Sequence, residues 1–352
     1  MKRTEGAIPV RCIGVELWIF SKNIRHVALA LRNGMPQTID FERPPMNRDA
    51  SAHSVAGAAI PGAYLAHLCL IITGGLLGLT TILAGLAVKT GWHPVSFLFW
   101  SSLGGGLLLM AISLLKGEKP KFSLSVLRYA LLSGLLSFAL PNILSFSAIP
   151  HTGAGFVSLC LAFPPLLTYA FALPFGMDRL SGKGITGMTV GLAGAVLLAL
   201  SNPATDPEGR FWAILALAAP VVIATGNIYR TIDWPRDTAQ GLLAPLMLLA
   251  ASAIIGLYIL TTGISLQPRA WTGASSLLLA AQIIIIAVTY IFFFMLQKLS
   301  GPVGLSQIGW IAAGTGKVLA VILLGEAVPA ILPPAFLLIL TGILLISRRS
   351  NP

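Results

Sequence analysis

Long apolar runs recur along this chain from residue 62 to residue 347, with short polar connections between them. A helix needs about 20 predominantly apolar residues to cross the hydrocarbon layer of a bilayer, which is about 30 Å thick. The runs lack the alternation of barrel strands, and spanning segments must pair their backbone polar groups internally. The composition, 56% hydrophobic and 10% charged, lies outside the range of soluble domains. The sequence therefore predicts an all-α integral membrane protein.

The spacing of these runs predicts about ten transmembrane helices. We place them at approximately residues 64–88, 94–115, 124–147, 152–175, 184–201, 210–229, 239–262, 270–296, 301–324 and 328–347.

The segment before the first apolar run has a different character. Residues 1–61 carry eight Lys or Arg and five Asp or Glu, and no run in them is long enough to span a bilayer. We expect a polar cytoplasmic extension whose composition is compatible with disorder. An alternative is that translation starts at Met46, in which case residues 1–45 are absent from the native protein. Residues 348–352 are expected to form a short basic cytoplasmic tail.

The basic residues between the runs indicate the orientation in the membrane. With a cytoplasmic N-terminus, ten basic residues fall on the inner side and three on the outer side, which is a positive-inside distribution. The inner set is Lys116, Lys119, Lys121, Arg179, Lys183, Arg230, Arg236, Lys298, Arg348 and Arg349, and the outer set is Lys89, Arg210 and Arg269. We therefore expect a multi-pass protein of the cytoplasmic membrane with both termini inside. This distribution explains the net charge of +11 without nucleic acid as a partner.

A shift of about 148 residues aligns related features of the two halves. It pairs Gly153 with Gly301, Ser158 with Ser306, Asp178 with Glu326, and Gly194 with Gly342. Five spans per half is an odd number, so the second half enters the membrane from the opposite side. The sequence predicts a five-plus-five inverted repeat, with residues 62–202 as the first half and residues 203–347 as the second.

These features resemble the ten-helix, EamA-like members of the drug/metabolite transporter superfamily. The resemblance covers about residues 64–347 and rests on the duplicated halves and on a carboxylate after the fourth helix of each, in GMDRLSGKGITG and LLGEAVPAILPP. It implies a secondary transporter of a small metabolite, with export as the expected direction. The chain departs from the family pattern at Asp178, one residue further from Gly176, and at Ala327 after Glu326. The role of the two carboxylates stays open for this reason.

The ninth predicted span carries a coherent stripe that includes polar residues. Gln307, Trp310, Gly314 and Lys317 fall on one helix face. Since an intramembrane charge needs compensation, we expect Lys317 to bind a carboxylate or phosphate of the substrate. Glu326 is too far along a continuous helix for a direct contact with it. The alternative for the stripe is helix packing. The alternative for Lys317 is a structural lysine paired with a backbone carbonyl or a distant carboxylate.

Four further polar residues are candidates for the same central site. Tyr169 is the repeat counterpart of Lys317, Asn142 follows Pro141, Asn227 lies beyond Pro220, and Gln282 shares a face with Thr289. Proline frees a backbone carbonyl and bends a helix, so an adjacent amide can line a cavity. Ordinary interhelical hydrogen bonding explains these residues as well. The predicted substrate-binding residues are thus Lys317, Gln307, Trp310, Tyr169, Asn142, Asn227 and Gln282.

Several function classes are disfavoured. The interiors of the predicted spans contain no Asp or Glu, so a carboxylate proton relay is poorly supported. Neither a GxxxxGK[ST] loop nor an HExxH motif occurs, and no cofactor or metal is expected. We predict a non-enzymatic carrier of a small solute such as an amino acid or organic anion, working by alternating access. The alternatives are a membrane-embedded enzyme acting on lipid-linked substrates and a non-transporting subunit or sensor.

Overall fold

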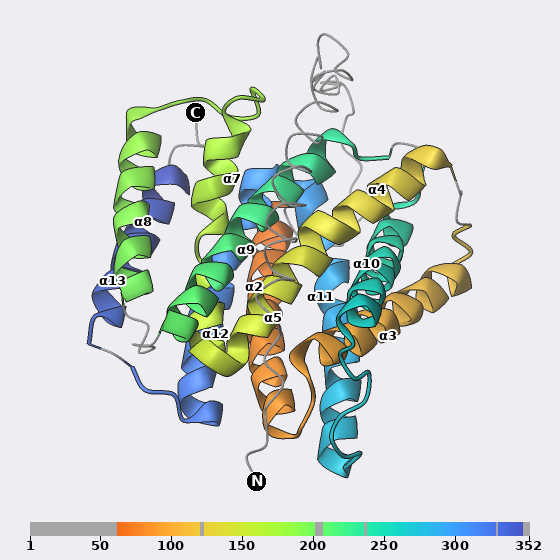
Figure 1. Ribbon diagram of the computed structural model, residues 1–352. Coiled ribbons are helices and arrows are strands. Elements are labelled where there is room, and N and C mark those ends of the chain that lie inside the picture. The colour runs from red at the N-terminus through yellow and green to blue at the C-terminus, as the bar shows by residue number, and fades with distance from the viewer. Residues whose placement is uncertain (1–61, 120–122, 201–206, 236–237, 329, 348–352) are drawn as a thin grey trace, which may run out of the picture. The chain divides into compact units, whose positions relative to one another are not determined.

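The computed structural model describes residues 62–119, 123–200, 207–235, 238–328 and 330–347, and within these ranges the regular structure is helical (Figure 1). The α-helices are α2 (Gly62–Lys89), α3 (Pro94–Leu115), α4 (Leu124–Gly134), α5 (Leu140–Thr152), α6 (Ala154–Cys160), α7 (Pro164–Ala172), α8 (Gly182–Leu200), α9 (Pro207–Ile232), α10 (Gln240–Thr262), α11 (Gly273–Ser306), α12 (Ile308–Leu319) and α13 (Leu332–Ser347). Two π-helical segments, η1 (Leu135–Ala139) and η2 (Ala320–Leu324), continue α4 into α5 and extend α12.

The predicted all-α membrane architecture is confirmed. Among the described residues, seven helical stretches are long and apolar enough to cross a membrane, and two shorter apolar stretches, Ile308–Leu324 and Leu332–Leu345, accompany them. The predicted extension 1–61, the tail 348–352 and the alternative start at Met46 lie outside the described residues.

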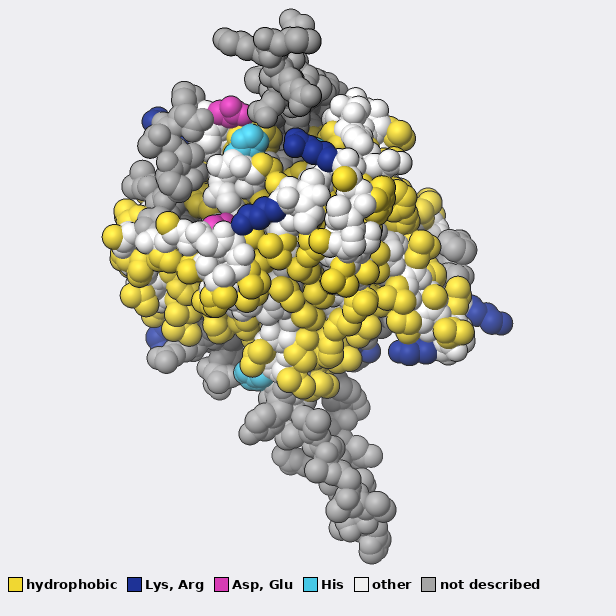
Figure 2. Space-filling model, turned by 90° about the horizontal axis from the view of Figure 1, so that it is seen from below, with side chains coloured by type: hydrophobic (Ala, Val, Ile, Leu, Met, Phe, Trp, Pro, Cys, Tyr) yellow, Lys and Arg dark blue, Asp and Glu magenta, His cyan; other side chains and the backbone are white. Residues whose placement is uncertain are grey.

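Large apolar side chains cover much of the molecular surface. Leu260 is 76% exposed, Leu277 71% and Ile322 69%. Figure 2 shows hydrophobic side chains spread over the visible face, with only a few charged residues among them. Such a surface is unfavourable in water and suits contact with lipid tails.

Proline shapes the third predicted span. The π-helical segment η1 lies directly before Pro141, whose ring removes one backbone N–H and crowds the preceding turn. The Asn142 amide donates to the carbonyl of Phe138 at 2.7 Å. The expected combination of a local distortion and an adjacent polar side chain is therefore present.

The fourth predicted span is interrupted, and the eighth continues through a kink into the ninth. The fourth is divided into α6 and α7 by three residues that precede Pro164 and Pro165. Helix α11 is longer than expected because it continues to Ser306, with non-helical backbone at Gly301, where φ is +64°. A residue with a side chain would be strained in that conformation, whereas glycine adopts it readily.

The helices pack in pairs that join distant parts of the chain. Helix α8 packs on α13, α3 on α10, α2 on both α11 and α12, and α9 on both α5 and α7. Figure 1 shows α8 beside α13 at the left and α3 beside α10 at the right, with α2, α5, α9 and α12 between them. Glycines permit the closest of these approaches, since a Cβ on Gly342 of α13 would lie 2.5 Å from the carbonyl oxygen of Gly187 in α8.

Candidate functional site

A cavity of about 70 Å³ lies between helices from both halves of the described chain. This volume is several times what one water molecule needs. Its walls come from α2, η1, α5, α6, α7, α9, α11 and α12. The polar residues of the lining are Thr80, Thr81, Ser137, Asn142, Ser145, Asn227, Arg230, Tyr290 and Ser306.

Arg230 is the charged residue of this lining. It lies near the end of α9 and is only 1% exposed. Its Nε donates to Oε1 of Gln297 at 3.0 Å, and one terminal nitrogen donates to Oδ1 of Asn227 at 2.8 Å. The guanidinium carbon lies 4.7 Å from the centre of the Phe293 ring, in a cation–π contact.

The partners of Arg230 are neutral. Among the described residues, the salt bridges are Arg128 with Asp233, His151 with Glu208, and Lys317 with Glu326, so Arg230 has no carboxylate partner there. Burying a guanidinium without an opposite charge is costly, and amide and ring contacts offset only part of that cost. A guanidinium in this state is suited to bind an anionic group that enters the cavity.

Three of the predicted site residues line cavities. Asn142 and Asn227 line the cavity that contains Arg230, and Gln282 lines a smaller adjoining one together with Asn142. Asn227 connects two elements, because its amide nitrogen donates to the Thr168 hydroxyl at 3.2 Å while its oxygen accepts from Arg230.

The other four predicted residues are absent from both cavity linings. The part of α12 that faces the larger cavity is formed by Ile308, Gly309 and Ala312, so the polar stripe from Gln307 to Lys317 points elsewhere. The amide nitrogen of Gln307 approaches the Val303 carbonyl at 3.5 Å. Tyr169 is fully buried, and its hydroxyl donates to the carbonyl of Arg179 at 3.1 Å. Trp310 is half-buried.

Lys317 is paired with Glu326, contrary to expectation. Their Nζ and Oε2 atoms lie 3.2 Å apart, and Nζ also donates to the carbonyl of Ala327 at 3.2 Å. The prediction that these residues cannot meet was wrong because it assumed a continuous helix. Gly325 adopts a left-handed conformation, with φ of +71°, and the chain turns back so that the Glu326 N–H donates to the carbonyl of Ala320.

Glu326 also joins two distant parts of the chain. Its carboxylate accepts from the backbone N–H of Gly155 at 3.0 and 3.1 Å, at the beginning of α6. A Cβ on Gly155 would lie 2.2 Å from Oε2 of Glu326 and 2.9 Å from Cδ of Lys317. Only glycine leaves room for this carboxylate.

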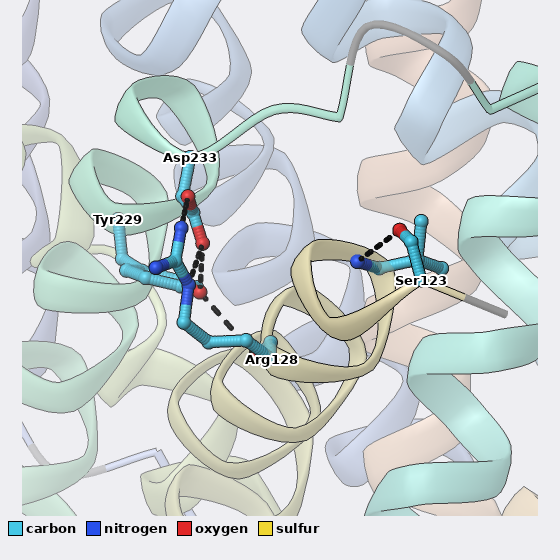
Figure 3. A network of polar contacts seen from close by, with 5 residues as sticks. Ser123, Arg128, Tyr229 and Asp233 are labelled. Atoms are coloured by element: carbon cyan, nitrogen blue, oxygen red, sulfur yellow. Dashed lines mark hydrogen bonds and ion pairs between the residues drawn. The ribbon is translucent and has the colours of Figure 1, made fainter.

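A second charged contact joins another pair of segments that are distant in the chain, α4 and the end of α9. Arg128 of α4 pairs with Asp233, just after α9, and the Tyr229 hydroxyl donates to the same carboxylate (Figure 3). Ser123 caps the beginning of α4 by accepting from the N–H of Val126 at 3.3 Å. These residues hold the end of α9 against α4, close in sequence to Arg230.

Sequence reasoning missed Arg230 because it was counted as a basic residue of an inner connection. The helix instead continues to Ile232, and the predicted end of the eighth span at residue 296 likewise stopped short of Gln297. One signal was available. Asn227 and Arg230 are three residues apart and so share a helix face.

No group of three or more His, Cys, Asp or Glu that could hold a metal ion occurs within the described ranges. Cys69 and Cys160 are buried free thiols. The chemistry offered by the cavity is therefore hydrogen bonding, one positive charge, and apolar contact.

Comparison with known proteins finds a family match within the first half of the chain. Residues 64–200 match the EamA-like transporter family. The Escherichia coli K12 protein described as "Uncharacterized inner membrane transporter YedA" is 31% identical over 172 residues, covering 47% of this chain and 55% of that protein. The Arabidopsis thaliana "WAT1-related protein At1g68170" is 31% identical over 125 residues, covering 35% of this chain and 33% of that protein. The chain thus matches about half or less of the length of these relatives.

A solved crystal structure shares the fold. It superposes with a TM-score of 0.59 at 22% identity, covering 84% of this chain and 100% of that chain. The predicted resemblance to EamA-like transporters is confirmed for residues 64–200, and the chain is similar to YedA and to the WAT1-related protein over the stretches given above.

Proposed function

We propose that this protein is a secondary transporter of a small anionic solute and that Arg230 binds the anionic group. The observation that carries the proposal is the fully buried guanidinium in a polar cavity, without a carboxylate partner among the described residues. Asn142 and Asn227 are the further substrate contacts, since both line the same cavity. The names of the relatives, transporters of an inner membrane among them, support the general function.

Lys317 has a different place in this proposal. Its charge is neutralised by Glu326, whose carboxylate also accepts from Gly155 of α6. Lys317 therefore stabilises the contact between Glu326 and α6 and does not bind the substrate. Gln307, Trp310 and Tyr169 lie outside the cavity linings and act through helix packing in the state described by the structure.

The helix contacts support a ten-span, five-plus-five inverted repeat formed by residues 62–202 and 203–347. Under the 148-residue shift, α8 corresponds to α13 and α3 to α10, and each of these pairs is in contact. The contact of α2 with α12 corresponds to that of α9 with α7, and α2 with α11 corresponds to α9 with α5. Gly153 and Gly301, which the shift also pairs, both have positive φ, at +82° and +64°.

Such a repeat suits alternating access, in which two related halves move about a central site. The Glu326–Gly155 and Arg128–Asp233 contacts each join the first half to the second, so each is expected to break in one state of the cycle. The distribution of basic residues favours cytoplasmic termini, and the family resemblance favours export across the cytoplasmic membrane.

The experiment is counterflow in proteoliposomes with matched radiolabelled anionic, zwitterionic and cationic solutes. A carrier exchanges solute without net turnover, whereas an enzyme or a sensor does not. We expect exchange of an anionic or zwitterionic solute. Arg230→Gln should lower affinity for it at least about 10-fold, since charge-assisted contacts in a buried site are strong.

Two variants serve as controls. Arg230→Lys keeps the charge and should retain part of the binding, although lysine lacks the planar fork of arginine. Arg269→Gln removes an exposed arginine that lies outside both cavity linings and should leave the affinity within about 3-fold. Equal affinity in wild type and Arg230→Gln would overturn the assignment of Arg230.

A further inference from the structure

A smaller cavity of about 30 Å³ adjoins the one that contains Arg230. The two share five lining residues, Leu77, Thr80, Asn142, Phe146 and Tyr290. The remaining wall of the smaller cavity is mostly apolar, with Leu98, Phe138 and Ile286, and its additional polar residues are Gln282 and Thr289. The two spaces therefore form one region with two polar ends.

Gln282 has an unused hydrogen-bond acceptor at this second end. Its side chain is fully buried, and its Nε2 approaches the Thr80 carbonyl at 3.4 Å. That carbonyl can only accept, so the orientation of the amide is fixed by its partner. Its Oε1 has no hydrogen-bond partner among the described residues.

Nearby hydroxyl groups do not satisfy this oxygen. The Thr289 hydroxyl donates to the carbonyl of Ile285 at 2.6 Å, and the Thr80 hydroxyl donates to that of Leu77 at 2.7 Å. Both protons are committed to backbone of their own helices. A buried acceptor left without a donor is unfavourable, so a donor that arrives with a ligand is favoured there.

The first end has the opposite character. Arg230 offers only donors. Its partner Gln297, which is outside both linings, likewise has a buried Nε2 without an acceptor among the described residues. One end of the region thus lacks an acceptor or anion, and the other lacks a donor. Leu77, Phe146 and Tyr290 provide a largely apolar wall common to both.

We propose that Gln282 is a specificity-determining residue, which selects anions that also carry a hydroxyl or ammonium group over anions that carry no hydrogen-bond donor. This inference rests on the proposed function, because it assumes that Arg230 holds the anionic group. A site built around a hydrogen bond rejects the analogue that lacks it, since the buried polar group is then left unpaired.

The test uses the purified full-length protein in detergent and measures binding by competition. The probes are straight-chain monocarboxylates of three to five carbons, each compared with its hydroxy and amino analogues at every carbon position. We expect at least one substituted acid to bind 10-fold or more tightly than its unsubstituted parent. Gln282→Leu should bring the two to within about 3-fold, mainly by weakening the substituted acid.

Gln282→Glu gives a second reading if the leucine variant does not fold. It keeps the size of the side chain and adds negative charge, so it should shift the preference from hydroxy acids towards amino acids. Size-exclusion chromatography checks the fold of each variant.

The outcomes separate the two proposals. Equal binding of parent and substituted acids by the wild type, or an unchanged preference in Gln282→Leu and Gln282→Glu, overturns the role of Gln282 and leaves that of Arg230 standing. Failure of the wild type to bind any carboxylate overturns both. Loss of binding of every acid in Arg230→Gln, together with loss of only the preference in Gln282→Leu, supports both.

Discussion

Lys317 and Glu326 form an ion pair at 3.2 Å although nine positions separate them along the chain. The left-handed Gly325 reverses the backbone after η2 and brings the carboxylate back to the lysine. The same carboxylate accepts from the N–H of Gly155. A charge that looks isolated within an apolar run is thereby compensated, and the pair links α12 to α6.

The role of this pair can be separated from substrate binding. Lys317→Gln should lower the free energy of unfolding by about 1–3 kcal/mol, because it leaves the largely buried Glu326 without its cation. Affinity for the transported anion should stay within about 3-fold of wild type. Denaturant unfolding in detergent and ligand binding measure the two effects.

A double-mutant cycle with Glu326→Gln is the control, and its coupling energy should be positive and about 1 kcal/mol or more. Loss of anion binding in Lys317→Gln with unchanged stability would instead indicate that Lys317 contacts the substrate.

The contact between α2 and α12 depends on Gly78. A Cβ at this position would lie 2.7 Å from the Ala312 carbonyl oxygen and 2.8 Å from the backbone nitrogen of Gly316. These are backbone atoms and cannot move aside cheaply. Gly78→Ala should therefore destabilise the protein by about 1–3 kcal/mol in denaturant unfolding.

Gly75 is a matched control in the same helix, since no atom lies within 4 Å of a Cβ built there. Gly75→Ala should be neutral or stabilising by up to about 1 kcal/mol, because alanine has the higher helix propensity. Equal effects of the two substitutions would show that close helix approach does not limit stability at Gly78.

His93 gives α3 a pH-dependent cap. Its Nδ1 accepts from the N–H of Val95 at 3.3 Å, and burial lowers the pKa of the imidazole below its usual 6.5. The neutral ring is thus favoured in the folded state, and its contribution to stability is complete above about pH 6.5. That contribution is lost as the pH falls below 6.5 and through the lower pKa of the folded state.

His93→Asn keeps a cap acceptor but does not titrate in this range. The melting temperature of the wild type should fall more between pH 7 and pH 5 than that of the variant. Parallel pH profiles of the two proteins would contradict this assignment. The two proteins differ at this residue alone, so a difference between their profiles reports on His93.

The prolines and amides that shape the cavity were recognisable in the sequence. Pro141 predicted a distortion with Asn142 beside it, and the structure places both on the cavity wall. Such features are local, because proline removes an N–H wherever it occurs and an amide next to it can donate to a nearby backbone carbonyl, as Asn142 does to Phe138. Asn227 was found by the same reasoning from Pro220, and Gln282 by the helix face that it shares with Thr289.

Arg230 and Lys317 show where local reasoning stops. The sequence around Arg230 suggested a loop between two spans, and the sequence around Lys317 suggested an isolated charge within the membrane. The role of Arg230 depends on α9 continuing to Ile232, and that of Lys317 on the chain turning at Gly325. Both features are seen only in the packed structure.

The sequence by itself determined the all-helical membrane architecture, since the length and apolarity of the runs leave no other way to pair the backbone in lipid. It also carried the likeness to EamA-like transporters. Only the tertiary structure decided that Lys317 has a carboxylate partner and that Arg230 is held by neutral amides. That outcome depends on Gln297 meeting Arg230 and on Glu326 meeting Gly155 across large separations in the chain. Periodicity within single helices holds no information about such contacts.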